Sequence, residues 1–553
     1  MLQANDSRDW PHGQYQHRGV AYGLNGAVSS AHPLATQSGL MCLRNGGNAI
    51  DALVTMAAVL SVVEPNSSGI GGVGYMIVAG PKMPIPQVLD FVGPSPKSAF
   101  RDQFKDPGDK DHGIKSAIVP GAIAGWDLAL KRYGTITLDQ ALRPAIDLAE
   151  SGFPVSQYLS RIIKASWYTF SRYETTSSIF TPNGKLPDVG DILVQRNLGR
   201  TLRVVAAEGA RAFYEGSVAD EIVSFAHNNG GLLSHDDLKS YEPVWQSPVH
   251  ATFRDSTIYC PPPPCSGLRY LVSLNILAGV EDLQLKAEPD YLHYLIEAFK
   301  IAGEDTRLEL HTPNGWQKFF EPSYASEVLR AVKQNAAAHW SGNRIGAEPH
   351  FELRMDDTFG AVRRESTTHL VAMDRAGYLA ACTQTIGGGP AKGFGSGVVY
   401  GNTGILMNNF AHWFDWDPES PNTVGPDKKV EMCLAPSIIV GRNGAIGAIG
   451  TPGSWRILQT TPQMILNHLA LQQNIQAAIE APRFCFGDSG QICMEGRFSS
   501  ETIQDLRRRG HVVEALPSWT PVVGGGHGIV RCARSGCLQG GADPRRDGIA
   551  LAY

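Results

Sequence analysis

The stretch 366–404 constrains the fold more than any other part of the chain. It holds two alternating, β-prone runs, 367–374 and 378–385. Only three residues separate these runs, and the third of them is Gly377. A short loop with glycine at its left-handed position is typical of a β-hairpin. The stretch therefore predicts two antiparallel strands in one sheet.

The register of this hairpin brings two threonines together. If Ala376 is the midpoint of the loop, Thr367 lies opposite Thr385 at the open end of the hairpin. Alternation along the strand places Thr367 and His369 on one face and Thr368 on the other. Facing threonines are also common in strands because of β-propensity alone, so this geometry by itself does not establish a function.

Composition places the chain among globular proteins. It has 553 residues, of which 43% are hydrophobic and 18% charged, so it can bury a large core. A formal net charge of -5, without a basic stripe, argues against a nucleic-acid partner. The N-terminal residues are polar and no later apolar run suffices to cross a bilayer, so we expect a cytoplasmic protein without a membrane partner.

Cysteine, histidine and glycine patterns give no sign of a cofactor or metal. Nine cysteines are scattered without a CxxC pair, and the proline-rich loop between Cys260 and Cys265 favours reduced thiols over a disulfide. The glycine run 69–74 follows a predicted helix and opens a predicted strand, which is the reverse of a dinucleotide-binding loop. There is no GxSxG or HExxH motif, and we interpret His369 and His412 as structural. We therefore expect no cofactor and no bound metal.

Helical periodicity is clear in the N-terminal third of the chain. Residues 35–43 and 49–63 predict two helices, and Asn48 is a candidate N-cap of the second. Residues 118–156 predict two more helices, joined at Gly134. With the hairpin, these segments indicate a mixed α and β architecture.

The chain resembles the γ-glutamyltransferase family of N-terminal nucleophile hydrolases. The resemblance is carried by TTHLVAMD at 367–374, GFGSGVVYGNTGILMNN at 393–409 and GTPGSWRI at 450–457. It extends over nearly all of residues 20–553. It implies an α+β fold, a four-layer αββα sandwich built jointly by two fragments of one precursor.

By this resemblance the precursor cuts itself between Ser366 and Thr367. The large subunit is then 1–366, with a mobile pre-cleavage segment at about 313–366, and the small subunit is 367–553. The two stay together as a heterodimer, and a dimer of heterodimers is left open. Cleavage frees an α-amine with a pKa of about 7.7 to 8.0, which can take the proton of the hydroxyl on the same residue.

The resemblance assigns further roles. Thr385 corresponds to a second threonine that orients the nucleophile by a hydrogen bond. The backbone N–H groups of Gly453 and Ser454 correspond to the pair that holds the developing oxyanion, with serine in place of the usual glycine. Arg101 corresponds to the arginine that clamps the carboxylate of the substrate.

The acyl pocket departs from the family pattern. Glutamyl-transferring members hold the α-amino group and carboxylate of the donor with polar side chains, and the residues at those positions here are Gly387, Phe410, Trp413, Met432 and Cys433. A buried ammonium without its anionic partner costs several kcal/mol. Asp415 could replace the missing acid only if its loop shifts by two residues.

We therefore expect an N-terminal-threonine hydrolase that cleaves a small-molecule amide or related acyl bond. Its acyl group would carry a carboxylate or α-keto acid end and no α-amino group, as in relatives that resemble oxamate amidohydrolases and cephalosporin or glutaryl acylases. Hydrolysis is favoured over transfer. The alternatives are a glutathione hydrolase or γ-glutamyltransferase, an oxalate-releasing C–C hydrolase, and an inactive member that serves as a binding protein.

Overall fold

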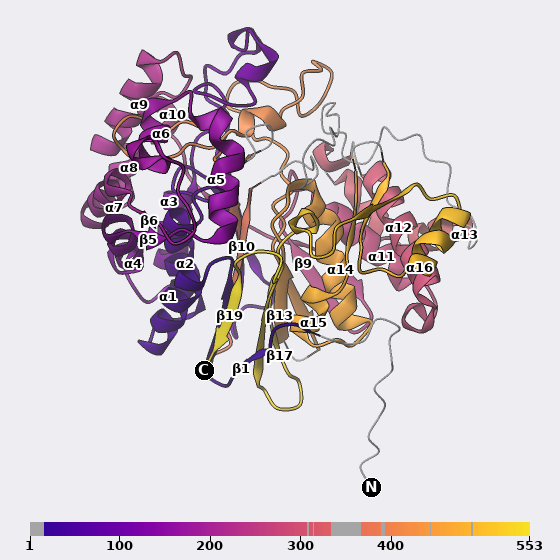
Figure 1. The fold of residues 1–553 in the computed structure, drawn as a ribbon. Coiled ribbons are helices and arrows are strands. Elements are labelled where there is room, and N and C mark those ends of the chain that lie inside the picture. The colour runs from indigo at the N-terminus through magenta and orange to yellow at the C-terminus, as the bar shows by residue number, and fades with distance from the viewer. Residues whose placement is uncertain are drawn as a thin grey trace.

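Two seven-stranded antiparallel sheets face each other at the centre of the molecule, and helices cover both outer faces (Figure 1). The computed structural model describes residues 16–306, 309–312, 314–332, 366–388, 393–442, 444–487 and 490–553. This arrangement is the four-layer αββα sandwich that the resemblance implies, and the prediction is confirmed.

The first sheet, here called the hairpin sheet, has the predicted hairpin β10–β11 at its centre. Thr368 pairs with Gln384 and Met373 with Leu379, which is the predicted register, and Gly377 has a φ of +95°. The strand order is β19-β2-β10-β11-β3-β4-β7. The strands are β2 (Gly26–Ser30), β3 (Val73–Ala79), β4 (Gln87–Asp90), β7 (Val244–Gln246), β10 (Thr368–Asp374), β11 (Leu379–Thr385) and β19 (Ile549–Ala552).

The second sheet, here called the facing sheet, has the order β1-β18-β17-β13-β12-β9-β8, and its β13 and β17 contact β10 and β11. Its strands are β1 (Ala21–Gly23), β8 (Val249–Phe253), β9 (Ser256–Cys260), β12 (Ser437–Gly441), β13 (Gly444–Gly450), β17 (His527–Arg531) and β18 (Leu538–Ala542). Two small sheets hold β5 (Phe153–Pro154) with β6 (Ile192–Leu193), and β14 (Phe484–Phe486) with β15 (Ile492–Glu495) and β16 (Val513–Leu516).

Helices of the N-terminal half lie on the hairpin-sheet side (Figure 1). Every residue of α2 is buried, and Asn48 begins this helix in a capping box with Asp51, so the predicted N-cap is confirmed. The helices are α1 (Pro33–Arg44), α2 (Ala49–Val63), α3 (Ala122–Tyr133), α4 (Leu138–Ser151), α5 (Gln157–Phe170), α6 (Glu174–Phe180), α7 (Arg196–Glu208), α8 (Arg211–Tyr214), α9 (Ser217–Asn228) and α10 (His235–Lys239).

Helices on the other side cover the facing sheet (Figure 1). They are α11 (Leu268–Ala278), α12 (Glu288–Asp305), α13 (Pro322–Ala331), α14 (Ile457–Leu469), α15 (Ile475–Glu480) and α16 (Ser500–Arg508). The hairpin contributes to both cores. Leu370 and Ala372 pack on the α2 side, whereas Val371 and Met373 pack between the sheets, as strand alternation predicts.

Part of the predicted pre-cleavage segment is regular structure, because residues 314–332 include the 3-10 helix η6 (Gly315–Phe320) and α13. Residues 333–365 lie outside the described residues, so the mobility expected there stays a prediction. All nine cysteines carry free thiols, as expected for Cys260 and Cys265. Within the described ranges, none of the helices combines the length and apolarity needed to cross a bilayer.

Candidate active site

The predicted cleavage point lies at the buried start of β10. Ser366 and Thr367 are 4% and 3% exposed. Thr385 Oγ1 donates a hydrogen bond of 2.5 Å to the Ser366 carbonyl oxygen and accepts one of 2.8 Å from the Gly387 N–H. The resemblance implied a bond to the nucleophile hydroxyl, but in the intact chain the second threonine contacts the carbonyl that Thr367 would attack. Such a bond stabilises negative charge on that oxygen.

Replacing Thr385 by valine should slow self-cleavage by about 10² or more, because one donor to the developing oxyanion is lost. The accumulation of full-length chain on a denaturing gel measures this rate. Thr385→Ser keeps the hydroxyl and is the matched control. Cleavage of the valine variant at the wild-type rate would show that the hydrogen bond to the Ser366 carbonyl is not used.

The glycine run 69–74 crosses closely over the end of the hairpin. A Cβ on Gly72 would lie 2.5 Å from the Thr385 carbonyl oxygen, and a Cβ on Gly74 would lie 2.7 Å from the Thr383 carbonyl oxygen. Real side chains do not reach such distances, so only glycine fits. The run lets the backbone pass tightly beside the end of β11.

The segment 64–68, directly after α2, lies beside the predicted cleavage point. The Asn66 carbonyl oxygen accepts a hydrogen bond of 3.0 Å from the Phe394 N–H. Ser366 Oγ and the Asn66 carbonyl oxygen lie 2.8 and 3.3 Å from the point that a Cβ on Gly393 would occupy. Asn66, Ser366 and Gly393 thus lie side by side, although they are far apart in the sequence.

Some of the buried polar atoms without hydrogen-bond partners belong to residues discussed for this site. Within the described ranges they include Glu64 Oε2, Asn66 Oδ1, Thr368 Oγ1, His369 Nε2, Asn409 Oδ1, Ser454 Oγ and Arg546 Nε. Each unpaired buried group costs about 1–3 kcal/mol.

The sequence analysis missed Glu64 and Arg546. Glu64 carries one usable signal, because it is an acidic residue directly after the apolar run 49–63. The sequence gives no such signal for Arg546, because nothing around this arginine near the C-terminus indicates that the chain returns to β10. The structure shows that Arg546 is buried and that its Nη1 donates a hydrogen bond of 3.2 Å to the Thr367 carbonyl oxygen.

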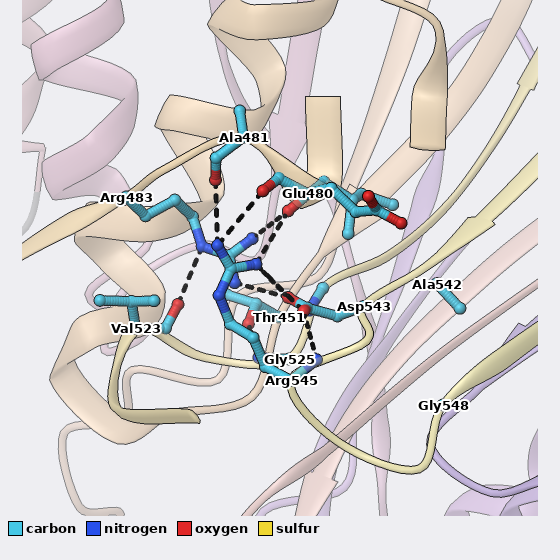
Figure 2. Close-up of polar contacts among 12 residues, drawn as sticks. Thr451, Glu480, Ala481, Arg483, Val523, Gly525, Ala542, Asp543, Arg545 and Gly548 are labelled. Atoms are coloured by element: carbon cyan, nitrogen blue, oxygen red, sulfur yellow. Dashed lines mark hydrogen bonds and ion pairs between the residues drawn. The ribbon is translucent and has the colours of Figure 1, made fainter. Parts of the chain in front are cut away.

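Figure 2 shows the charged cluster that anchors the chain beside Arg546. Arg483 and Arg545 both donate to Asp543, at 2.5 and 3.0 Å, and all three side chains are fully buried. The Gly525 N–H, in the same view, donates to Thr451 Oγ1 at 2.9 Å. The cluster therefore fixes the segment before Arg546 next to the turn that carries the predicted oxyanion donors.

That turn follows β13, at the end of the facing sheet. A Cβ on Gly450 would overlap the His369 ring, so the turn begins directly against β10, the strand that follows Thr367. Gly453 has a φ of +137° and Ser454 a φ of +56°. Serine is uncommon in the left-handed region, and its presence here shows that the turn accepts a Cβ. The oxyanion role of the two N–H groups stays a prediction.

The residues at the predicted pocket positions are mostly apolar and buried. Phe410, Met432 and Cys433 are at most 1% exposed. Trp413 ends the 3-10 helix η8 (Phe410–Trp413) and stacks on Trp455, with ring centroids 5.2 Å apart and planes at 23°. Because Trp455 directly follows Ser454, this aromatic pair adjoins the turn that carries the predicted oxyanion donors.

Gly387 has a neighbour that takes the place of its missing side chain. It has a φ of +87°, and a Cβ on it would overlap Asn409 Oδ1. The Asn409 amide group donates to the carbonyl oxygens of Asp111 and Gly388, at 2.7 and 3.1 Å. Its oxygen, which has no partner within the described part of the chain, remains available to accept a hydrogen bond.

Two carboxylates near the pocket already have partners. Asp415 accepts a hydrogen bond of 2.5 Å from Ser420 Oγ. Glu431 pairs with Arg269 at 2.9 Å and with His311 at 3.2 Å. Although burial alone would raise the pKa of Glu431, these partners lower it. The charge of Glu431 is therefore balanced by its partners, whereas Asp415 stays an anion and interacts with Lys110 and Lys428.

Arg101 lies on the surface, in the 3-10 helix η1 (Arg101–Gln103). Its guanidinium has no hydrogen bond or ion pair with any described residue. Phe104, three residues on, is buried and packs edge-on against Trp416, with ring centroids 6.2 Å apart. This packing fixes the base of the Arg101 segment, but no contact joins Arg101 to Thr367.

Three further histidines bear on a structural or metal-binding role. His412 is buried in η8 and its ring lies 3.2 Å from the Asn409 carbonyl oxygen, which fits a structural role. His293, Glu297 and His511 form a buried cluster that the sequence analysis did not find and whose atoms could hold a metal. Lys300 Nζ lies within hydrogen-bond distance of Glu297 and His511, so an ammonium already occupies the place of a cation.

Facing sheets between helices, with a threonine at the buried start of a central strand, define an N-terminal nucleophile hydrolase. Residues 35–553 match the family model described as gamma-glutamyltranspeptidase, and the chain belongs to that family. It is 33% identical over 543 residues to the glutathione hydrolase-like YwrD proenzyme of Bacillus subtilis, covering 96% of this chain and 98% of that one.

Other relatives carry acylase names. The acylase ACY 1 proenzyme of Pseudomonas sp. (strain V22) is 32% identical over 552 residues, covering 96% of this chain and 94% of the relative. The crystal structure of cephalosporin acylase from Bacillus halodurans matches with a TM-score of 0.86 at 30% identity, covering 99% of both chains. The chain is thus an autoprocessed hydrolase of this family, whose members are made as proenzymes and processed into a large and a small subunit.

Proposed function

We propose that this enzyme hydrolyses an amide whose acyl group carries a carboxylate but no α-amino group. The observation that carries the proposal is the set of buried apolar side chains at Phe410, Met432 and Cys433, where glutamyl-transferring relatives are expected to be polar. Glu431 supplies no free anion, because Arg269 and His311 hold it, and the charge of Asp415 interacts with Lys110 and Lys428.

Energetics favour an acyl group without an amine. An ammonium buried against this pocket without an anionic partner would cost several kcal/mol. Each 1.4 kcal/mol is a factor of ten in binding or rate, so the loss for a γ-glutamyl group is about 100-fold or more. Arg101, whose guanidinium has no described partner, supplies the cation for the carboxylate.

The reaction proceeds through a threonyl ester. The Thr367 α-amine takes the hydroxyl proton, and Oγ1 attacks the acyl carbon. The N–H groups of Gly453 and Ser454 stabilise the oxyanion. The α-ammonium then gives the proton to the leaving amine, and water releases the acid. Names of both glutathione hydrolases and acylases among the relatives support this acyl-transfer chemistry.

A matched set of p-nitroanilides tests the proposal. The glutaryl and γ-glutamyl compounds differ only in the α-amino group, and the glutaryl compound should have a kcat/KM about 100-fold higher or more. The valeryl compound, which lacks the carboxylate, should be a poor substrate. Arg101→Gln should lower turnover of the glutaryl compound and leave that of the valeryl compound unchanged.

A preference for the γ-glutamyl compound would support the alternative function, that of a glutathione hydrolase. Faster turnover of the γ-glutamyl compound would mean that the pocket provides an anion after all, and the enzyme would then be a glutathione hydrolase. Equal turnover of the glutaryl and valeryl compounds would remove Arg101 from the site. Release of p-nitroaniline without an added amine acceptor distinguishes hydrolysis from transfer.

A further inference from the structure

The turn that carries the predicted oxyanion donors contains one strained residue. Ser454 has a φ of +56°, in the left-handed region, where an L-residue other than glycine pays a conformational penalty. A short polar side chain can offset part of this penalty by a local hydrogen bond. Ser454 Oγ is buried and has no hydrogen-bond partner among the described residues, so its own side chain does not compensate. Neighbouring groups must therefore hold the residue in this conformation.

The next residue, Trp455, is held by two side chains. Its ring stacks on Trp413, with centroids 5.2 Å apart and planes at 23°. The Arg269 guanidinium also lies over the Trp455 ring, 4.9 Å from its centroid. The 3-10 helix η9 (Ser454–Arg456) begins at the strained serine, so Trp455 belongs to the same short turn. A ring that is held in this way limits the rotation of the backbone directly before it.

Arg269 is itself fixed in place. The side chain is buried, and its Nη2 pairs with Glu431 at 2.9 Å. Glu431 also accepts a hydrogen bond from Ser266 Oγ, and it lies 3.2 Å from His311 Nε2. The guanidinium over the Trp455 ring therefore cannot move away without breaking a buried ion pair.

Contacts with the C-terminal segment place this turn near Thr367. A Cβ on Gly453 would lie 3.6 Å from Gly524 Cα, and a Cβ on Gly525 would lie 2.7 Å from Arg546 Cδ. Arg546 Nη1 in turn donates to the Thr367 carbonyl oxygen at 3.2 Å. Neither N–H group of the predicted donor pair donates to a backbone carbonyl of the described residues. The turn and Thr367 thus both contact the C-terminal segment.

We propose that Trp455 is a positioning residue for the oxyanion donors. Its ring, held by Trp413 and Arg269, keeps Ser454 in the left-handed conformation, and this conformation directs the Ser454 N–H to the developing oxyanion. Glycine, the usual residue at this position, needs no such anchor, because it adopts a positive φ without penalty. The inference rests on the oxyanion role given to this turn in the proposed function, but not on the identity of the acyl group.

The test compares Trp455→Leu in two backgrounds, the wild type and Ser454→Gly. Processing into two pieces is checked on a denaturing gel, and kcat per processed enzyme is measured with the fastest of the glutaryl, γ-glutamyl and valeryl p-nitroanilides. In the wild-type background kcat should fall by about 5- to 30-fold, the population cost of the left-handed region for an L-residue. In the Ser454→Gly background it should fall only about twofold, because glycine populates positive and negative φ about equally.

The dependence on background separates positioning from packing. A looser acyl pocket would change KM by the same factor in both backgrounds, and a general loss of stability would lower kcat equally in both. Trp455→Phe keeps a ring beside Trp413 and Arg269 and should retain most of the wild-type kcat. If Trp455→Leu is not processed, Trp413→Leu removes the stacking partner instead and should show the same dependence on background.

An equal fall of kcat in the two backgrounds, or no fall in the wild-type background, would overturn the proposal. So would a loss in Trp455→Phe as large as that in Trp455→Leu. An error in the proposed acyl specificity would appear instead in the order in which the wild type turns over the three p-nitroanilides, so the two failures can be told apart.

Discussion

Thr367→Ala should leave the chain in one piece and abolish hydrolysis. Self-cleavage and turnover both need the hydroxyl of this residue, and the α-amine that serves turnover exists only after cleavage. We expect turnover to fall by at least about 10⁴, the scale on which loss of a nucleophile is felt. Mass analysis of the purified protein should show residues 1–366 and 367–553 as separate pieces for the wild type, and a single chain for the variant.

Thr367→Ser is the control, since it keeps a hydroxyl and should still be processed. The mature small subunit should begin with TTHLVAMD. An alanine variant that still splits at this bond and turns over substrate would assign the chemistry to another nucleophile.

Local patterns in the sequence were enough to predict the hairpin and several helices. The register of β10 and β11 follows from a three-residue loop, because the two strands are neighbours in the chain. The α2 helix follows from an apolar run with Asn48 before it. The four layers do not follow from such patterns, since each strand gives no indication of its distant partner, and only the family resemblance predicted them.

The residues of the candidate site also fall into those that the sequence predicts and those that it does not. Motif resemblance is what predicted Thr367, Thr385 and the turn at Gly453 as site residues. It could not locate Arg546, because the hydrogen bond from Arg546 to the Thr367 carbonyl spans 179 positions and depends on the packing of the two sheets. The hydrogen-bond partner of Thr385 could not be predicted from the sequence either. A hydroxyl at the end of a hairpin can reach several oxygens, and only the three-dimensional structure shows which of them it bonds.

Departures from the family pattern were more informative than matches. The idea that Asp415 replaces a missing acid after a loop shift was open from the sequence alone. In the structure this carboxylate accepts from Ser420 Oγ, which gives it a structural task. At position 387 the polar side chain of the family pattern is missing, and the Asn409 side chain fills the space beside Gly387.

Asp543→Ala should lower the free energy of unfolding by about 3–5 kcal/mol. The carboxylate pairs with Arg483 and Arg545, and it accepts a hydrogen bond of 2.9 Å from the Gly526 N–H. Its loss leaves two buried guanidinium groups with less compensating charge, since only Glu495, which pairs with Arg545 at 2.6 Å, remains beside them. Urea unfolding of the full-length chain measures the change.

Because a processed enzyme consists of two chains, the comparison is best made in the Thr367→Ala background, where unfolding is closer to a two-state process. Asp255→Ala provides the contrast. Asp255 pairs with Arg442 on the surface, where both side chains are at least 75% exposed, so its loss should cost about 1 kcal/mol or less. Equal effects of the two substitutions would contradict the structural role given to the buried cluster.

Acid unfolding tests the same cluster through the charge of Asp543. Burial alone would raise the pKa of Asp543, but the charges of Arg483 and Arg545 hold it well below its ordinary value. The unfolded chain therefore binds a proton at higher pH than the folded chain. The stability that Asp543 supplies should be complete above about pH 4 and should fall as the pH drops towards the folded pKa. Asp543→Ala should lack this part of the acid dependence; a variant that retains it would show that another carboxylate balances the two arginines.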